Sequence, residues 1–237
     1  MFERSEAVPD GPNDPGRTAV WLEACSAVYV EVPKVACSSI KIALASLLGM
    51  DLRPSGGDPH KARFPEPPVR QPGPTLYPGL FSFAFVRNPW DRLVSCYRDK
   101  ILGEVRDFTA LDPVRGVAFC LARFDDFRPG MSFEAFVRAV SAIFDQEADE
   151  HFRSQHSFVT NAAGKLAVDY VGRFETLDRD FRRVCEKLGR PDLKLPVVQA
   201  ANPRRRYTEY HTPETRDLVS ERFREDIRLF EYTFQEA

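Results

Sequence analysis

The sequence contains no apolar run that approaches the roughly 20 residues needed to cross a bilayer as a helix. Residues 1–17 carry Glu3, Arg4 and Glu6 among several prolines and glycines, and this composition excludes a secretory signal peptide there. We predict that residues 1–19 are disordered. We predict that residues 20–237 form one domain, because a chain with 43% hydrophobic residues can bury one substantial core.

Paired cysteines and an excess of positive charge are also lacking. The five cysteines are odd in number and show no C-x-x-C spacing, which indicates neither a zinc site nor a disulfide framework. We therefore predict no bound metal. The formal net charge of -2 argues against a general nucleic-acid-binding protein, because that role needs a clear basic excess.

One stretch predicts a strand, a turn and a helix without interruption. Valines at every second position from Val28 to Val32 are typical of a strand, and Pro33 ends it. Apolar residues then recur at helical spacing from Ile40 to Leu48. A strand that runs through a short turn into a helix is therefore expected here.

The turn itself, from Lys34 to Ser39, has the composition of an anion-binding site. The first amides of a helix have no partners within the helix, and the helix dipole favours negative charge beside them. Ser38 and Ser39 would add hydroxyl donors, and Lys34 would reach over the same anion. The alternative is a serine-capped helix after an ordinary strand, with a solvated lysine.

This turn differs from the nucleotide-binding loop G-x-x-x-x-G-K-[ST], in which glycines wrap the phosphates and the lysine comes near the end. Here the turn has no glycine and Lys34 comes first. A lysine at the end of the strand lies nearer the terminal group of the ligand than a 5′-phosphate bound to the helix amides. The order therefore suits transfer of a group attached to that phosphate.

A second strand-to-helix transition follows the apolar run from Phe81 to Val86, and Pro89 can start its helix. Arg87 would lie at the carboxyl end of this strand, where its planar guanidinium matches phosphate oxygens, and Ser95 would lie deeper in the site. The alternatives are an ion pair between Arg87 and Asp91 and a packing role for Ser95.

The sequences P-K-V-A-C-S-S from Pro33 and F-V-R-N-P-W-D-R-L-V-S-C-Y-R-D-K from Phe85 resemble the two nucleotide-binding motifs of carbohydrate sulfotransferases of the chondroitin and glucuronyl type. The resemblance covers about residues 28–234. It implies an α/β fold, a P-loop-like three-layer domain with a central, mostly parallel sheet flanked by helices.

The resemblance also implies the reaction. A sulfuryl group would pass from 3′-phosphoadenosine 5′-phosphosulfate (PAPS) to an acceptor hydroxyl, most readily on a sugar, with 3′,5′-diphosphoadenosine as product and no metal. Lys34 would assist this transfer. By resemblance, the 3′-phosphate contacts Arg87 and Ser95, and the 5′-phosphosulfate contacts Lys34, Val35, Ala36, Cys37, Ser38 and Ser39.

The general base that takes the acceptor's proton is less well defined. H-F-R-S-Q from His151 is similar to the family's H-W-x-P-Q segment, with Phe152 and Ser154 in place of Trp and Pro, so His151 is the first candidate. His60 is an alternative, because related glycan sulfotransferases can carry their base between the two nucleotide motifs. Carboxylates such as Glu175 are further rivals, and the sequence does not decide among them.

Arg204, Arg205 and Arg206 form the densest basic cluster. Other sulfotransferases close a C-terminal basic loop over the 3′-phosphate, which makes Arg204 and Arg206 candidates for that contact. A solvated run of charge is an equally good interpretation.

Localisation, rival functions and the acceptor complete the hypotheses. Animal members of the family in the Golgi have an N-terminal membrane anchor, and its absence here predicts a cytoplasmic, bacterial enzyme, with a shortened chain as the alternative. A P-loop kinase would need Mg²⁺ ligands and a different loop, and the presence of Lys34 argues against a non-catalytic nucleotide-binding relative. Neither the acceptor nor the oligomeric state can be read from the sequence.

Patterns elsewhere predict further elements. A helix is expected over residues 132–144 with Phe144 on its buried face, and another over residues 213–230. Lys41 is expected on the outer face of the first helix. Residues 53–79 are expected to form a long loop, which is uncommon in compact domains unless the loop covers or builds a site.

Overall fold

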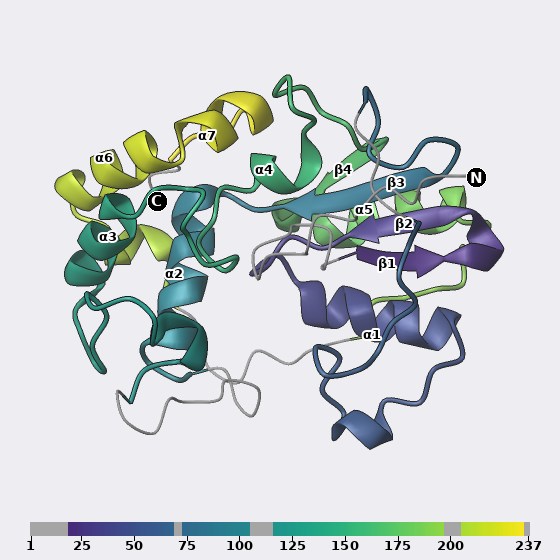
Figure 1. Ribbon diagram of the computed structural model, residues 1–237, viewed down its shortest axis with the longest axis horizontal. Coiled ribbons are helices and arrows are strands. Elements are labelled where there is room, and N and C mark those ends of the chain that lie inside the picture. The colour runs from purple at the N-terminus through teal and green to yellow at the C-terminus, as the bar shows by residue number, and fades with distance from the viewer. Residues whose placement is uncertain (1–18, 69–72, 105–115, 197–204, 235–237) are drawn as a thin grey trace, which may run out of the picture.

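A four-stranded sheet lies at the centre of the computed structural model, which describes residues 19–68, 73–104, 116–196 and 205–234 (Figure 1). β1 pairs antiparallel with β2, whereas β2 with β3 and β3 with β4 pair parallel, so the predicted mostly parallel sheet flanked by helices is confirmed. The strands stand in the order β1 (Ala19–Leu22), β2 (Ala27–Val30), β3 (Phe81–Val86) and β4 (Tyr170–Arg173).

The two central strands are buried on both faces, as parallel strands covered by other elements usually are. Tyr29 of β2 and Phe83 of β3 pack ring against ring, with centroids 5.4 Å apart. Gly172 of β4 leaves room for Phe85, because a Cβ atom there would lie 2.4 Å from the Phe85 ring. Since β2, β3 and β4 run parallel, the residues that follow each of them meet at one edge of the sheet.

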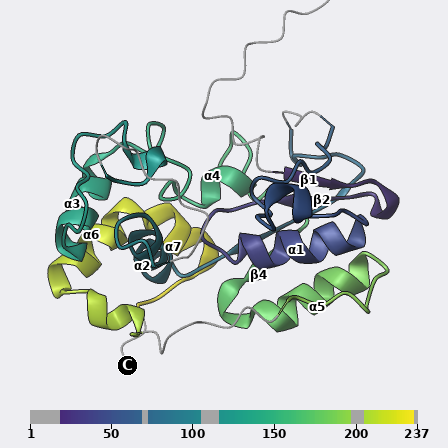
Figure 2. The ribbon, with the colours of Figure 1, turned by 90° about the horizontal axis from the view of Figure 1, so that it is seen from below.

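The helices fall into two groups (Figures 1 and 2). α1 and α5 run along the sheet, whereas α2, α3, α6 and α7 gather beyond the carboxyl ends of β2 and β3. None of the helices in the described ranges is both long enough and apolar enough to span a membrane. Their bounds are α1 (Cys37–Leu47), α2 (Pro89–Lys100), α3 (Phe133–Ala142), α4 (His156–Val159), α5 (Leu177–Lys187), α6 (Pro213–Arg222) and α7 (Arg224–Phe230).

Both predicted strand-to-helix transitions are present, as β2 to α1 and β3 to α2. α2 begins at Pro89, and the side chain of Asn88 caps it by accepting a hydrogen bond from the Trp90 main-chain nitrogen. β1 begins at Ala19, one residue inside the segment predicted to be disordered. Residues 1–18 lie outside the described residues.

Three local predictions were wrong. α3 ends at Ala142, so the helical register no longer carries Phe144 inward, and Phe144 is 74% exposed. The predicted last helix is two helices, because Phe223 (φ -112°, ψ 29°) leaves the helical conformation between α6 and α7. Lys41 does not extend into solvent, because its Nζ atom pairs with Glu31 at 2.6 Å and its side chain is largely covered.

Arg92 of α2 is 2% exposed and ties three segments of the chain together. Its Nε atom donates to the Pro33 carbonyl oxygen at 2.9 Å. Its two terminal nitrogens donate to the carbonyl oxygens of Arg153, at 2.8 Å, and Glu150, at 3.1 Å. Burial lowers the pKa of Arg92, and the charge of Asp226 opposes this shift. The guanidinium thus fixes the turn after β2 and the segment around His151 on the same helix.

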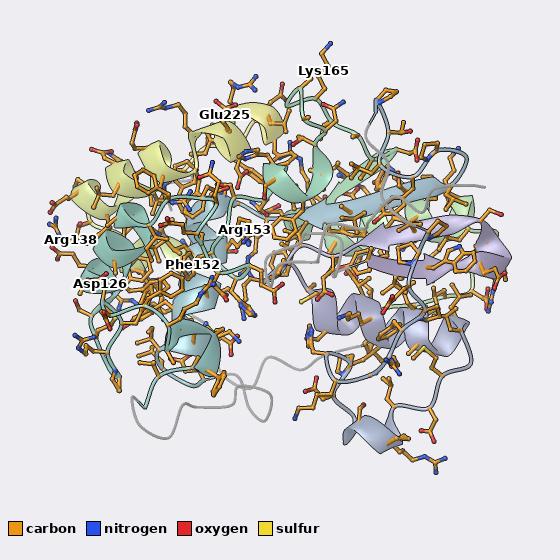
Figure 3. All side chains as sticks on the ribbon, in the orientation of Figure 1. Asp126, Arg138, Phe152, Arg153, Lys165 and Glu225 are labelled. Atoms are coloured by element: carbon orange, nitrogen blue, oxygen red, sulfur yellow. The ribbon has the colours of Figure 1, made fainter. Side chains whose placement is uncertain are left out.

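The segment that Arg92 holds is itself inside the protein. Figure 3 shows Phe152 and Arg153 between the helical group and the sheet, whereas Lys165 and Glu225 lie at the rim. Phe152 is fully buried against Phe124 and Phe127, so its ring anchors the segment by apolar contact.

We expect Arg92→Met to lower the free energy of unfolding by about 2–4 kcal/mol, because methionine fills much of the space but leaves buried carbonyl oxygens without their donors. Urea unfolding of the purified protein measures the change. Arg228→Met is the matched control, since Arg228 pairs with Glu225 at the exposed surface, where ion pairs contribute little. Equal losses in the two variants would contradict the role assigned to Arg92.

Candidate active site

The turn between β2 and α1 adopts left-handed backbone conformations without any glycine. Lys34 has φ +69° and Ala36 has φ +53°, values that residues with a Cβ atom rarely adopt. Such strain persists only where surrounding contacts impose it, and it clusters at binding sites. Successive main-chain N–H groups in such a turn can also point toward one concave site, which is suited to an anion.

The N-terminus of α1 is open. Its N-cap residue is Ala36, no side-chain capping hydrogen bond is present in the described part of the chain, and no acidic residue lies in the first turn. The first amides of this 11-residue helix are uncapped, so its N-terminus is suited to bind an anion. The alternative of a serine-capped helix is therefore wrong, because Ser38 and Ser39 lie inside the first turn.

The sequence also predicts that Val35 and Cys37 contact the 5′-phosphosulfate, and the structure limits what each can contribute. The Val35 side chain is buried in the core, which leaves its main chain to meet a ligand. Burial raises the pKa of the Cys37 thiol to about 11, with the charge of Glu31 as the next cause. Cys37 is therefore a neutral thiol at pH 7 and does not repel an anion at the helix end.

Lys34 is directed toward α2. Its Nζ atom lies 2.5 Å from Asp99 Oδ2, and its side chain is 13% exposed. The carbonyl oxygen of Lys34 accepts a hydrogen bond from Arg87 NH1 at 3.2 Å. The structure thus brings together the lysine of the first motif and the arginine of the second, as the sequence predicted for one site.

Arg87 is buried and held from several sides. Its Nε atom pairs with Asp91 Oδ2 at 2.8 Å, so the ion pair considered as an alternative is present. Its guanidinium lies 4.0 Å from the centre of the Phe174 ring. Gln155 accepts from the Arg87 main-chain nitrogen and donates to its carbonyl oxygen, at 2.9 and 2.8 Å. The arginine is therefore fixed at the strand end with its charge partly neutralised.

Ser95 lies on the face of α2 that also carries Arg92 and Asp99, because these residues are three and four positions apart. Arg92 binds the carbonyl oxygen of Pro33, and Asp99 binds the side chain of Lys34. The half-buried Ser95 therefore lies between two contacts to the same turn.

His60 comes to the turn from the long segment that follows α1. Its Nε2 atom lies 2.8 Å from Ser38 Oγ, and its Nδ1 atom lies 3.5 Å from Glu31 Oε1. Burial lowers the pKa of His60, partly opposed by Glu31, while the charges of Lys41 and His151 lower it further. A neutral imidazole thus contacts the predicted donor loop at pH 7.

His151 lies close enough to His60 for a positive charge on it to lower the pKa of His60. Its Nδ1 atom lies 2.6 Å from Asp149 Oδ1, and the Asp149 carboxylate also accepts from the His151 main-chain nitrogen. Burial raises the pKa of Asp149, but these hydrogen bonds outweigh it and the net shift is downward. The ionised carboxylate favours the tautomer with the proton on Nδ1, which leaves Nε2 able to accept a proton.

The other two histidines have structural partners. His156 Nδ1 lies 2.9 Å from Asp226 Oδ1, and this hydrogen bond raises the pKa of His156. His211 packs against the Phe133 ring and contacts the Trp90 carbonyl oxygen, and burial lowers its pKa to about 4. Neither is placed as a base at the turn.

Glu175 also has a structural role. It accepts from the Asn88 main-chain nitrogen at 2.7 Å and from the Tyr232 hydroxyl at 3.0 Å. Both carboxylate oxygens are thus used in holding the start of α2 to the last described residues. This occupancy disfavours Glu175 as the base.

The basic cluster is only partly described. Arg204 lies outside the described residues. Arg206 is exposed and precedes a short 3-10 helix, Tyr207–Tyr210, that packs on α2, the helix that carries Ser95. Arg205 pairs with Glu209 at 3.2 Å and lies 5.0 Å from the Tyr210 ring centre, but its side chain is exposed, so a solvated charge remains a fitting interpretation of this residue.

The comparison with protein families agrees with this geometry. The Sulfotransferase family matches residues 19–233, which include the turn, the second motif and both candidate bases. The chain belongs to the sulfotransferase family. Members of this family are PAPS-dependent transferases, which fits an open helix end for one anion beside an arginine and a serine for another.

Several relatives of this sulfotransferase are known. It is 29% identical to carbohydrate sulfotransferase 14 of Mus musculus over 182 residues, which cover 73% of this chain and 47% of the relative. It is 26% identical to carbohydrate sulfotransferase 9 of Homo sapiens over 233 residues, covering 87% and 51%. The chain thus spans about half the length of these relatives. An uncharacterized protein of Archaeoglobus fulgidus is 28% identical over 131 residues, covering 55% of this chain and 86% of the relative. No solved structure matches.

Among the residues that the structure describes, two groups of side chains could hold a metal ion. In each group the three ligand atoms lie within 4.8 Å of one another, and each contains one candidate base. The prediction of no bound metal stays a prediction. The groups are Glu31, Cys37 and His60, and Cys120, Asp149 and His151.

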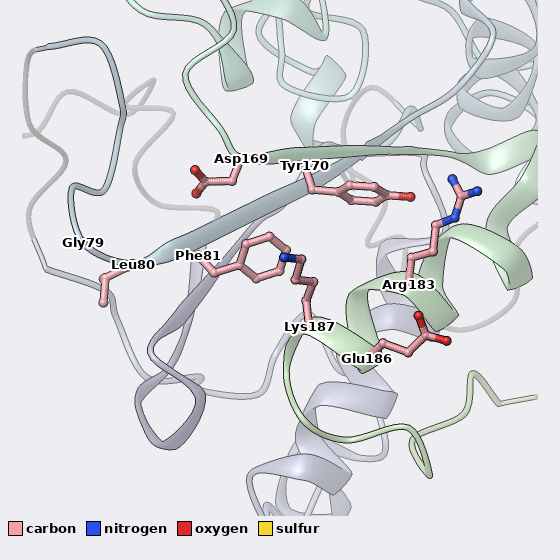
Figure 4. A pocket seen from close by; sticks show the side chains of 8 residues that line it. All are labelled: Gly79, Leu80, Phe81, Asp169, Tyr170, Arg183, Glu186 and Lys187. Atoms are coloured by element: carbon pink, nitrogen blue, oxygen red, sulfur yellow. The ribbon is translucent and has the colours of Figure 1, made fainter.

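A cleft of about 880 Å³ lies elsewhere on the sulfotransferase (Figure 4). Phe81 and Tyr170 are the first residues of β3 and β4, so the cleft lies at the edge of the sheet opposite the candidate site. Arg183 and Lys187 of α5 extend toward these two rings. The cleft is therefore separate from the two motifs that the sequence predicts to bind the donor.

We expect the stabilising contribution of His156 to be lost as the pH rises. The pKa of His156 is raised in the folded protein, so its contribution is fully present below about pH 6.5 and disappears as the pH passes the folded value. The difference in unfolding free energy between the wild type and His156→Gln should therefore shrink as the pH rises above about 6.5. Urea unfolding across this range measures it, and a difference that does not change with pH would contradict the assignment.

Proposed function

We propose that the protein transfers a sulfuryl group from PAPS to a hydroxyl of a carbohydrate or glycoconjugate. The observation that carries this proposal is the uncapped N-terminus of α1, preceded by left-handed Lys34 and Ala36 and adjoined by Arg87. Membership of the sulfotransferase family supports the donor. The similarity to carbohydrate sulfotransferases 14 and 9 supports a sugar acceptor.

In this proposal the 5′-phosphosulfate occupies the open end of α1. The main-chain amides of residues 35–39 and the hydroxyls of Ser38 and Ser39 donate to it. Arg87 and Ser95 receive the 3′-phosphate, since a guanidinium fork and a hydroxyl together match phosphate oxygens. Arg206 is the described residue of the basic cluster that would approach the same phosphate.

For this reaction the protein must position the donor and the acceptor and stabilise the negative charge that develops. The acceptor oxygen attacks sulfur, the bond from sulfur to the bridging oxygen breaks, and 3′,5′-diphosphoadenosine leaves with the electron pair. Lys34 stabilises the negative charge that develops on the bridging oxygen, as fixed cations do in related group transfers. The acceptor's proton passes to a base.

His151 is the proposed base, because Asp149 holds its Nδ1 atom and leaves Nε2 for the acceptor hydroxyl. His60 is the alternative, and its contact with Ser38 supports a position beside the sulfuryl group. In the first assignment His60 orients the Ser38 hydroxyl in the donor loop. In the alternative the roles are exchanged.

A kinase is less well supported. The turn keeps its shape without the glycines of a nucleotide loop, and the lysine precedes the helix instead of lying at its start. A non-catalytic nucleotide-binding relative would not need Lys34 or either histidine near the turn.

We expect 3′,5′-diphosphoadenosine, added without metal, to raise the melting temperature. A ligand at 100 times its dissociation constant adds about 2.7 kcal/mol of stability, whereas ATP with Mg²⁺ should add much less. Differential scanning fluorimetry measures both. Arg87→Met should reduce the shift and Arg228→Met should retain it. A larger shift with ATP and Mg²⁺ would overturn the proposal in favour of a kinase.

We expect His151→Ala to lower kcat by about 100-fold or more, which is the range for loss of a general base. The KM for PAPS should stay near the wild-type value. His60→Ala should raise the KM for PAPS more than it lowers kcat, because His60 contacts the donor loop. Turnover is measured with labelled PAPS on an acceptor found by screening sugars. The opposite pattern would assign the base to His60.

A further inference from the structure

Asp99 is a buried carboxylate that no step of the proposed reaction uses. It lies in the last turn of α2 and is 5% exposed. Its Oδ2 atom lies 2.5 Å from Lys34 Nζ and 3.2 Å from Lys100 Nζ. One carboxylate thus meets two ammonium groups, and the three side chains together carry one positive charge.

The cluster contains more positive charge than the carboxylate needs. Lys100 also adjoins the carboxylate, and Asp99 raises the pKa of Lys100 against the opposing effect of burial. Lys100 already neutralises Asp99, so the fold does not require Lys34 for charge balance. Charge balance alone therefore does not explain the contact between Asp99 and Lys34.

The contact acts on a flexible side chain. A lysine has four rotatable bonds, and ordering its side chain costs up to about 2 kcal/mol of conformational entropy. Asp99 supplies this ordering before a ligand binds. It stands one turn beyond Ser95 on the same face of α2, so the ammonium is held between the donor turn and the helix that carries Ser95.

We propose that Asp99 is a positioning residue that holds Lys34 ready for the bridging oxygen of the donor. This inference rests on the proposed function. When the phosphosulfate binds, its negative charge competes with Asp99 for the ammonium, while Lys100 keeps the carboxylate paired. The carboxylate repels the anionic nucleotide, so positioning comes at the cost of some affinity.

The proposal predicts opposite effects on turnover and on binding. Asp99→Asn keeps the shape of the side chain and removes its charge. We expect kcat to fall about ten-fold or more, because a misplaced cation stabilises the leaving oxygen poorly. We expect 3′,5′-diphosphoadenosine to bind about three-fold or more tightly, because one negative charge near the anion is gone. A purely structural role would weaken both.

The experiment measures kcat and KM with labelled PAPS, and the dissociation constant of 3′,5′-diphosphoadenosine by calorimetry. Glu104→Gln is the matched control, because it removes one negative charge from an exposed ion pair with Arg98 beside the same helix end. Its kcat and dissociation constant should equal those of the wild type. Asp99→Glu keeps the charge and moves the carboxylate. It should lower kcat while leaving the dissociation constant within about two-fold of the wild type, and it carries the test if the Asn variant does not fold.

Unchanged kcat in Asp99→Asn, or parallel losses of turnover and nucleotide binding, would overturn the role of Asp99. This result differs from failure of the proposed function. If the wild type binds no 3′,5′-diphosphoadenosine and transfers no sulfuryl group, the sulfotransferase proposal itself fails. If the wild type does both and Asp99→Asn behaves as the wild type, only the positioning role is lost.

Discussion

The buried guanidinium of Arg92 carries a positive charge into the interior and binds three main-chain oxygens there, one just before the turn that follows β2 and two in the segment around His151. A buried charge is costly unless it is hydrogen-bonded, so the three carbonyl groups are constrained to remain where the guanidinium can reach them. Pro33 is thereby fixed before the donor turn, and Glu150 and Arg153 are fixed on either side of His151. Donor loop and candidate base keep their spacing because both are tied to one side chain of α2.

The positively charged side chains of the site are paired with carboxylates, whereas the main-chain amides at the start of α1 are not paired with side chains. Arg87 is held by Asp91, Lys34 by Asp99, and Lys41 by Glu31, yet the amides at the start of α1 have no side-chain partner. The carboxylates thus orient the cationic side chains in advance, while the N-terminus of α1 stays open to an anion. A nucleotide with two anionic ends would meet both kinds of group in one place, with little rearrangement of the main chain.

Much of this arrangement could be predicted from sequence. Valine alternation, apolar helical spacing and the residues at two strand ends placed Lys34 and Arg87 at one edge of a parallel sheet. Three features could not be predicted. The position of His60 depends on a long segment without periodicity, whose place is set by tertiary contacts with Ser38 and Glu31. The burial of Arg92 contradicts the usual exposure of charged residues, and left-handed conformations at Lys34 and Ala36 cannot be inferred from residue types that rarely adopt them.

The site also depends on contacts between distant parts of the chain. The Asn88 side chain donates a hydrogen bond to the Thr233 carbonyl oxygen. The Asp226 carboxylate accepts hydrogen bonds from the main-chain nitrogens of Gln155 and His156. Contacts of such large sequence separation form late, because the loops between them must close first. On the ribosome, the strands and α1 would emerge long before α7. The nascent chain would therefore expose an unfinished candidate site until α7 had left the exit tunnel, and a nucleotide would meet the assembled site only after that point.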